Sequence, residues 1–285
     1  MENNVQEKDL FIDIDKVIKS RNSKILKMLP KFIINYIKRI IHQDDLNYFV
    51  STYKHLSGID FVNESTVEFG TKVTVIGGEN LQNSERNFIF ASNHPLGGID
   101  GALLIRELTK LSKETKSISN DLMLNLVSMR PCFIGVNLYG GNSKDAVAAL
   151  DAEFNSDINI LFFPAGMVSR RTKGVIKDLE WKNTFVKRAI KHHRDIVPIH
   201  VSGRLTNFFY NFANLRKKLG IKFNIELFFL VDELFRQRKD HITITIGKPI
   251  PYAYFKANGN PNFHAEKMRD FVYELAKNND ATYTE

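Results

Sequence analysis

Residues 88–101 read Phe-Ile-Phe-Ala-Ser-Asn-His-Pro-Leu-Gly-Gly-Ile-Asp-Gly, and this stretch decides the predicted fold. The apolar run over 88–92 is typical of a buried strand, and a tight Pro/Gly loop follows it. The aspartate near the end of the stretch is placed to begin a helix that continues through leucines over 101–112. The segment therefore predicts a strand, a loop and a helix in direct succession, a unit typical of α/β proteins.

The loop of this unit carries a histidine and an aspartate that suit proton transfer. A carboxylate such as Asp100 that binds one ring nitrogen of His94 fixes the tautomer, so the other nitrogen is free to take a proton from a hydroxyl. We predict His94 as a general base and Asp100 as its partner, with Asn93 as an acceptor-binding residue. The backbone of Gly97 and Gly98 is predicted to bind an oxyanion or to shape the loop. Simpler roles stay open, namely a helix cap for the aspartate and a carbonyl partner for the histidine.

A second segment, residues 158–171, reads Ile-Asn-Ile-Leu-Phe-Phe-Pro-Ala-Gly-Met-Val-Ser-Arg-Arg. A buried strand ends in Pro-Ala-Gly, and the loop after it presents Ser169, Arg170 and Arg171. Adjacent guanidinium groups suit a carboxylate or a phosphate, so we predict these three residues as acceptor-binding. Gly166 is a further candidate for the oxyanion or loop backbone. The alternative is a solvated arginine pair on an exposed loop.

Two more strand ends carry polar residues. Residues 133–142 pass from a strand into a glycine-containing loop, from which we predict Asn137 as acceptor-binding. Residues 196–204 form a strand that ends in Ser-Gly-Arg. Both this segment and residues 133–142 are explained equally well as ordinary strand ends. His200 lies on an apolar strand and is interpreted as a core histidine outside the site.

Short β-branched or aromatic runs alternate with helical patterns from residue 71 onward. Strands are expected over 71–76, 88–92, 132–136, 158–163, 196–201, 225–230 and 242–247, and helices over 101–112, 143–155, 182–193, 206–218 and 263–277. This alternation predicts an α/β fold with a central, largely parallel or mixed sheet flanked by helices. No linker divides residues 57–285, so we expect them to form one domain. The functional loops should lie at the carboxyl ends of the strands.

Residues 1–56 are predicted to be a separate helical segment. Between residues 25 and 41 apolar side chains recur at helical spacing, and lysines and an arginine take the other face. Two interpretations stay open for this basic amphipathic segment. It is either a surface helix packed on the core or a helix that lies on a membrane surface.

Composition narrows the class of protein. The 285 residues are 43% apolar and 25% charged, as in ordinary globular proteins, and the formal net charge is +8. The single cysteine, Cys132, cannot form an intramolecular disulfide, which favours a reducing, cytoplasmic setting. No apolar run is long enough to span a bilayer, and no zinc-ligand spacing occurs, so we predict neither a transmembrane segment nor a metal. The positive charge favours an anionic partner, but no nucleic-acid-binding motif is present.

Taken together, these segments resemble the glycerolipid acyltransferase superfamily typified by lysophosphatidic acid acyltransferases. Within this superfamily they resemble the hemolysin-like and amino-acid-lipid O-acyltransferase branch. The resemblance covers residues 87–251 in four ordered blocks: Asn93-His94 with Asp100, residues 135–137, residues 163–166 with Ser169, and residues 197–199. Two details differ from the usual pattern. Five residues rather than four separate His94 and Asp100, and Ala165 and Val168 stand where the family usually has Glu and Arg.

The resemblance implies an acyltransferase domain over 57–285 that moves a fatty acyl group to the hydroxyl of a lipid. The acyl donor would be an acyl carrier protein or acyl-CoA, the acceptor an N-acyl amino acid lipid or a lysophospholipid, and no cofactor would be needed. The enzyme would act peripherally on the anionic cytoplasmic face of the inner membrane. Two other classes of protein are alternatives. One is a serine lipase or thioesterase, which is disfavoured because no Gly-x-Ser-x-Gly motif occurs, and the other is a non-catalytic protein that binds anionic membranes.

Overall fold

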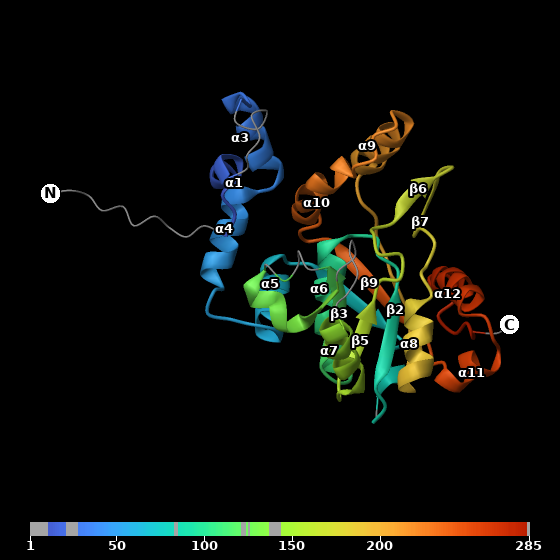
Figure 1. Ribbon diagram of the computed structural model, residues 1–285. Coiled ribbons are helices and arrows are strands. Elements are labelled where there is room, and N and C mark those ends of the chain that lie inside the picture. The colour runs from blue at the N-terminus through green and yellow to red at the C-terminus, as the bar shows by residue number, and fades with distance from the viewer. Residues whose placement is uncertain are drawn as a thin grey trace.

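The computed structural model of the chain describes residues 11–20, 28–82, 85–120, 124, 126–136 and 144–283. A seven-stranded sheet lies at its centre (Figure 1). In sheet order the strands are β1 (Lys72–Ile76), β9 (His241–Ile246), β8 (Asp195–Val201), β2 (Phe88–Ser92), β5 (Asn159–Phe162), β3 (Thr115–Asn120) and β4 (Phe133–Val136). Neighbouring strands are parallel except β8 and β9, which are antiparallel. The predicted α/β class with a mixed, largely parallel sheet is confirmed.

The central strand β2 has an apolar layer on each side. All five of its residues are buried. Because side chains alternate along a strand, Phe88 and Phe90 enter one apolar cluster while Ile89 and Ala91 enter the other. A strand buried on both faces reads as a continuous apolar run, which is why 88–92 shows no polar alternation.

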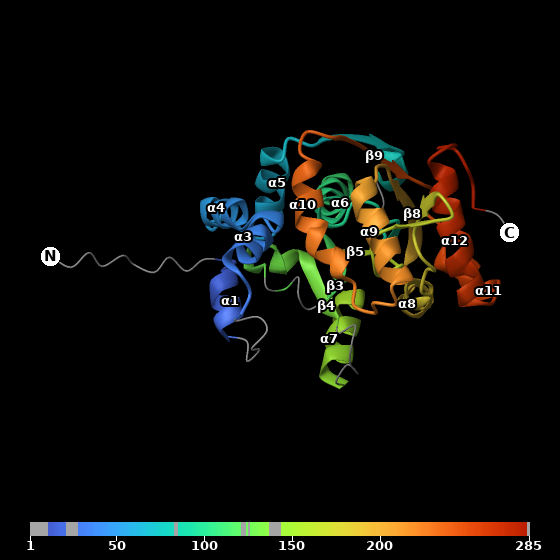
Figure 2. The same ribbon diagram turned by 90° about the horizontal axis from the view of Figure 1, so that it is seen from above.

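Helices cover both faces of the sheet (Figures 1 and 2). The first apolar cluster includes residues of α5 (Ile59–Glu68), α6 (Gly98–Leu111) and the 3-10 turn η3 (Val127–Cys132). The second includes residues of α7 (Lys144–Asn155), α8 (Thr184–His192), α11 (Tyr252–Ala257) and α12 (Pro261–Leu275). No helix in the described ranges is both long and apolar enough to cross a bilayer.

The described parts of residues 1–56 are mostly helical, in α1 (Ile14–Ser20), α3 (Lys31–Ile40) and α4 (Gln43–Thr52). At the end of this segment Phe49, Tyr53 and Leu56 pack against the first apolar cluster. By contrast, α3 buries none of its residues, and Phe32 is 73% exposed. The segment is therefore tied to the core at its end while the apolar residues of α3 stay accessible.

A group of short elements stands beyond the carboxyl ends of β5 and β8 (Figure 1). The strands β6 (Arg170–Thr172) and β7 (Val175–Lys177) form an antiparallel pair after β5. The helix α9 (Asn207–Lys218), the 3-10 turn η4 (Ile225–Phe229) and α10 (Leu230–Arg236) follow β8. These elements cover the carboxyl ends of the parallel strands β2, β5 and β8 (Figure 1).

The expected strand over 225–230 is wrong, because η4 and the start of α10 occupy these residues. The segment is rich in apolar residues, which is typical of a strand, but Phe228 is 55% exposed. The buried member of the segment is the acidic residue Glu226, which faces Arg170 and Arg216. A partnered carboxylate, rather than an apolar face, fixes the conformation of this segment.

Candidate active site

His94 and Asp100 are in contact at the carboxyl end of β2. The Nδ1 atom of His94 lies 3.0 Å from Oδ1 and 3.1 Å from Oδ2 of Asp100. The Asp100 side chain is fully buried, while that of His94 keeps 19% of its surface exposed. The loop of residues 95–99 therefore brings the predicted pair within hydrogen-bonding distance. In the described part of the chain no group binds Nε2 of the histidine.

The carboxylate of Asp100 also orders the loop and the start of α6. The backbone N–H of Leu96 donates to Oδ2 at 2.8 Å, and the N–H of Gly101 donates to Oδ1 at 2.8 Å. Gly97 is the residue before the helix and has φ of 80°, a conformation that glycine adopts without strain. Gly97 rather than Asp100 takes the N-cap position, so the helix-cap interpretation of Asp100 is wrong. The same carboxylate nevertheless binds the imidazole and lies in the first turn of α6, where negative charge is favourable.

Several charges act on the imidazole. Burial lowers the pKa of His94, but the charge of Asp100 and its hydrogen bond raise it, as does Asp178, and Arg170 opposes them. The net result is a pKa above the ordinary value of histidine. The ring stacks on Phe163, with 4.1 Å between the ring centroids. A nearby carboxylate thus makes the imidazole a stronger base while the aromatic ring holds its plane.

A second buried acid, Asp178, supports the backbone of the histidine. Its Oδ1 accepts hydrogen bonds from the N–H of His94 at 3.2 Å and from the hydroxyl of Ser169 at 2.6 Å. Its Oδ2 accepts from the indole of Trp181 at 2.9 Å, and its own N–H donates to the hydroxyl of Tyr273 at 2.8 Å. Burial raises the pKa of Asp178, and these hydrogen bonds oppose the rise. Asp178 thus joins the backbone of His94 to Ser169, Trp181 and Tyr273.

Sequence reasoning missed Asp178 because it stands 84 positions from His94, in a segment with no distinctive motif. The available signal was an aspartate three residues before the only tryptophan of the chain. That pair alone predicts no contact with the histidine. The contact depends on how the loop after β5 folds back: the N–H of Ser169 donates to the carbonyl of His94 at 2.8 Å.

The structure places the predicted acceptor-binding residues 169–171 differently from one another. The hydroxyl of Ser169 is buried against Asp178. Arg170 is only 3% exposed, and its guanidinium lies 3.1 Å from Glu226. Arg171 is more accessible: it donates to the side chain of Asn207 at 3.3 Å and to that of Asn211. Of the two arginines, Arg171 is therefore the one that an incoming anion reaches more readily.

Glu226 holds two buried arginines at once. Its Oε1 pairs with Arg170, and its Oε2 lies 2.8 Å from Nε of Arg216, which is 6% exposed. Burial lowers the pKa of Arg170, and the charge of Glu226 counteracts that effect. This cluster ties β6 to α9 and η4, so the arginine predicted to bind a ligand already has a counterion within the protein.

Asn93 joins the ends of two strands. Its amide donates to the carbonyl of Val201 at 2.9 Å and accepts from the N–H of the same residue at 2.7 Å. The side chain is buried, so the structure gives its predicted role in acceptor binding no direct support. Asn137 lies outside the described residues.

The three candidate glycines also differ. The N–H of Gly166 donates to the carbonyl of Phe163 at 2.9 Å, and φ at this residue is 66°. Gly166 therefore matches the loop-forming role, and its amide is not free to bind an oxyanion. The N–H groups of Gly97 and Gly98 have no acceptor in the described part of the chain. They remain available beside His94.

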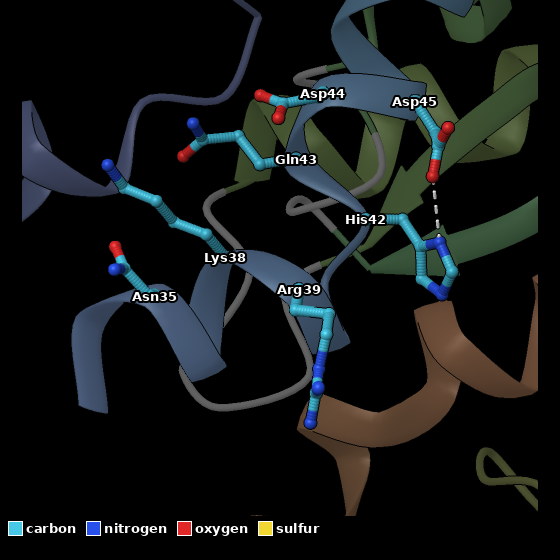
Figure 3. Close-up of a pocket in the computed structure, with 7 residues that line it drawn as sticks. All are labelled: Asn35, Lys38, Arg39, His42, Gln43, Asp44 and Asp45. Atoms are coloured by element: carbon cyan, nitrogen blue, oxygen red, sulfur yellow. Dashed lines mark hydrogen bonds and ion pairs between the residues drawn. The ribbon is translucent and has the colours of Figure 1, made fainter. Parts of the chain in front are cut away.

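A pocket among the N-terminal helices is lined by none of these residues (Figure 3). It has a volume of about 520 Å³ and is lined by Asn35, Lys38, Arg39, His42, Gln43, Asp44 and Asp45. His42 points toward Asp45 (Figure 3), with 2.9 Å between Nδ1 and Oδ2, and its Nε2 lies 3.1 Å from Oδ1 of Asp232 in α10. Its ring also stacks on Phe235. This pocket therefore belongs to the joint between the N-terminal helices and α10.

Within the described ranges, no group of three or more His, Cys, Asp or Glu residues has the arrangement of a metal site. His200, which the sequence placed in the core, lies on β8 beside Tyr273. Burial lowers its pKa to about 4, so it is neutral at physiological pH. The pKa of His200 is thus lowered, whereas that of His94 is raised.

This fold and this histidine-aspartate pair agree with a family assignment. The chain belongs to the acyltransferase family, whose model matches residues 16–282. The lyso-glycine lipid O-acyltransferase of Bacteroides thetaiotaomicron is 44% identical over 93% of this chain and 97% of its own length. The enzyme of the same name from Phocaeicola vulgatus is 45% identical over 93% of this chain and 95% of its own. The predicted enzyme class, an O-acyltransferase, is confirmed.

The crystal structure of the 1-acyl-sn-glycerophosphate (LPA) acyltransferase PlsC from Thermotoga maritima is a more distant match. Its sequence is 15% identical, the TM-score is 0.47, and the match covers 95% of this chain and 89% of that one.

Proposed function

We propose that this protein transfers a fatty acyl group from a carrier thioester to the hydroxyl of a lyso-glycine lipid, with His94 as the general base. The observation that carries the proposal is the contact of 3.0 Å between His94 and the buried Asp100. The acceptor follows from the two relatives at 44% and 45% identity, which are named lyso-glycine lipid O-acyltransferases. An acceptor of this kind is an N-(3-hydroxyacyl) amino acid with one free hydroxyl.

The reaction follows from the orientation of the imidazole. Asp100 accepts a hydrogen bond from the N–H at Nδ1, which leaves the lone pair of Nε2 for the acceptor hydroxyl. As the hydroxyl oxygen attacks the thioester carbonyl, its proton passes to Nε2. The tetrahedral intermediate then expels the thiolate, and the thiolate takes the proton from Nε2 to leave as a free thiol. General-base help of this kind contributes about 10²–10⁴-fold to the rate.

The oxyanion of the intermediate needs hydrogen-bond donors that are already in place. We assign this role to the N–H groups of Gly97 and Gly98, because they lie at the start of α6 and have no acceptor in the described part of the protein. A helix N-terminus carries partial positive charge, which stabilises a developing anion.

Binding of the acceptor carboxylate is assigned to the arginines after β5. Arg171 is the more accessible of the two, and Arg170 adds positive charge although Glu226 neutralises part of it. A planar guanidinium binds a carboxylate through two parallel hydrogen bonds, which suits the glycine end of the acceptor.

The donor and the cellular setting complete the proposal. An acyl carrier protein or acyl-CoA supplies the thioester, and the enzyme works peripherally on the anionic cytoplasmic face of the inner membrane. The net charge of +8 and the exposed Phe32 and Tyr36 of α3 support attachment to an anionic surface. No cofactor or metal takes part in these steps.

An acceptor comparison tests the proposed function. Purified enzyme should acylate an N-(3-hydroxyacyl)glycine with acyl-CoA or acyl carrier protein as donor, and the product is measured by mass spectrometry. The matched control is the same N-acylglycine without the 3-hydroxyl, which should yield no product because the nucleophile is missing. Use of lysophosphatidic acid alone would refute the proposed acceptor, and product from neither acceptor would refute acyl transfer to these lipids.

The raised pKa of His94 predicts a pH dependence. The value of kcat/KM should fall as the pH decreases through this pKa, because a protonated imidazole cannot accept a proton. Asp100→Asn removes the charge that raises the pKa, so the acidic limb of the pH profile of kcat/KM should move to lower pH. The value of kcat should fall as well. Asp178→Asn should shift the limb in the same direction but less. A limb that stays at the same pH in both variants would show that another group controls the profile.

A further inference from the structure

An apolar surface covers α9 and the segment that follows it. Large apolar side chains rarely stay exposed in a cluster unless they bind something. Here the residues 40–66% exposed between Asn207 and Phe229 are Phe208, Leu215, Leu219, Ile221, Phe223 and Phe228. We call these six residues, together with Lys217, Lys218 and Lys222, the α9 face.

The charge of the α9 face is positive and unopposed. The three lysines are exposed, and in the described part of the chain none of them has an ion-pair partner. Glu226 is the only acidic residue between Asn207 and Phe229, and it is fully buried against Arg170 and Arg216. The face thus combines apolar side chains with uncompensated positive charge.

The α9 face stands over the edge of the sheet where His94 lies. Beneath it, Phe209 and Tyr210 of α9 pack with Val168 from the loop after β5. A Cβ atom placed on Gly97 would lie 3.5 Å from Leu230, at the start of α10, and 3.5 Å from Val168. Val168 therefore lies between α9 and the loop that holds the histidine, and the start of α10 lies next to the same loop.

The same end of the molecule also carries α3. Figure 1 shows α3 and α9 projecting beyond the sheet on the same side, and Figure 2, viewed from above, shows them separated across that end. A flat surface that meets this end of the protein can touch both helices. This geometry suits an extended surface better than a small partner.

We infer that the α9 face binds the surface of an anionic lipid bilayer and delivers the lipid acceptor to His94 from that side. The inference rests on the proposed function, in which the acceptor is a lipid. Phenylalanines and leucines enter the boundary between headgroups and acyl chains, while lysines attract anionic headgroups. An acidic carrier protein would match the lysines but leaves the six apolar side chains without a partner, so the bilayer fits both features.

Vesicle sedimentation of the full-length enzyme tests this inference. One set of vesicles contains phosphatidylcholine alone, and the other also contains about one third phosphatidylglycerol, which makes the surface anionic. Each basic residue near an anionic surface strengthens binding by about fivefold, so the two sets separate the charge contribution from the apolar one. The face variant combines Phe223→Ser, Phe228→Ser, Lys217→Gln and Lys218→Gln. Its binding to anionic vesicles should be at least about tenfold weaker than that of the natural protein. Added salt should also weaken the binding of the natural protein to these vesicles.

The control variant changes the same number of apolar and basic residues elsewhere. It combines Phe263→Ser, Val67→Ser, Lys256→Gln and Lys277→Gln, all at exposed positions. It should bind vesicles like the natural protein, and circular dichroism should show both variants folded. Equal binding by the two variants would overturn the inference, as would a face variant that keeps its vesicle binding but no longer binds acyl carrier protein. No acyl donor is present, so a failure of the proposed acyl transfer leaves this measurement unaffected.

Discussion

Replacement of His94 by alanine is expected to lower kcat by at least about two orders of magnitude while the protein stays folded. The imidazole is the proton acceptor in the proposed reaction, and its loss leaves only the positioning of the substrates and the oxyanion donors. The side chain is 19% exposed and is not part of the apolar clusters. Steady-state kinetics at saturating acceptor measures the loss, and the thermal unfolding midpoint reports on the fold.

His55→Ala is the matched control, because it removes an exposed histidine distant in sequence from the proposed site. Its kcat should stay close to that of the natural enzyme. A folded His94→Ala enzyme with near-normal turnover would end the proposal that this histidine is the base. Asp100→Asn should retain more activity than His94→Ala, because the base remains although its tautomer and pKa change.

The sequence predicted the parts of the site that lie close together in the chain. Residues 88–92 form a buried strand as expected, and Asp100 reaches His94 across a single loop. Both inferences used information within about fifteen residues, where periodicity and turn chemistry are informative. The longer separation of His94 and Asp100 relative to the usual family spacing did not prevent the contact.

Contacts between distant segments could not be predicted in this way. Asp178 reaches the backbone of His94 only because the loop after β5 folds back onto β2. The strand β3 was also missed, since its residues Thr-Lys-Ser-Ile-Ser-Asn are mostly polar and weak as a strand signal. Its place in the sheet depends on parallel pairing with β4 and β5, which no local pattern reveals.

The segment around Glu226 shows how a local pattern misleads. Its apolar residues read as a buried strand, yet Phe228 is 55% exposed and belongs to the α9 face. The arginine pair after β5 was likewise interpreted as a ligand site, and Arg170 proves to have a counterion within the protein. Both interpretations lacked the same fact, the contact between residues 170 and 226, which are 56 positions apart.

Removal of the carboxylate of Glu226 is therefore expected to be among the most destabilising single changes in this protein. Glu226→Ala leaves the guanidinium groups of Arg170 and Arg216 buried without a counterion, which typically costs about 3–5 kcal/mol of unfolding free energy. Equilibrium unfolding in urea measures this loss. Asp270→Ala is the matched control, since its pair with Lys177 at 2.6 Å is exposed, and it should cost at most about 1 kcal/mol.

The double change Arg170→Met with Glu226→Met separates the structural role of this cluster from a role in acceptor binding. It removes the pair together, so the remaining loss of stability should be smaller than in Glu226→Ala, although Arg216 still lacks its partner. If Arg170 also binds the acceptor carboxylate, the KM for an N-(3-hydroxyacyl)glycine rises in this variant at a temperature where it is folded. An unchanged KM would confine Arg170 to the ion cluster. A Glu226→Ala protein as stable as the Asp270→Ala control would instead show that the buried carboxylate contributes no more than a surface ion pair.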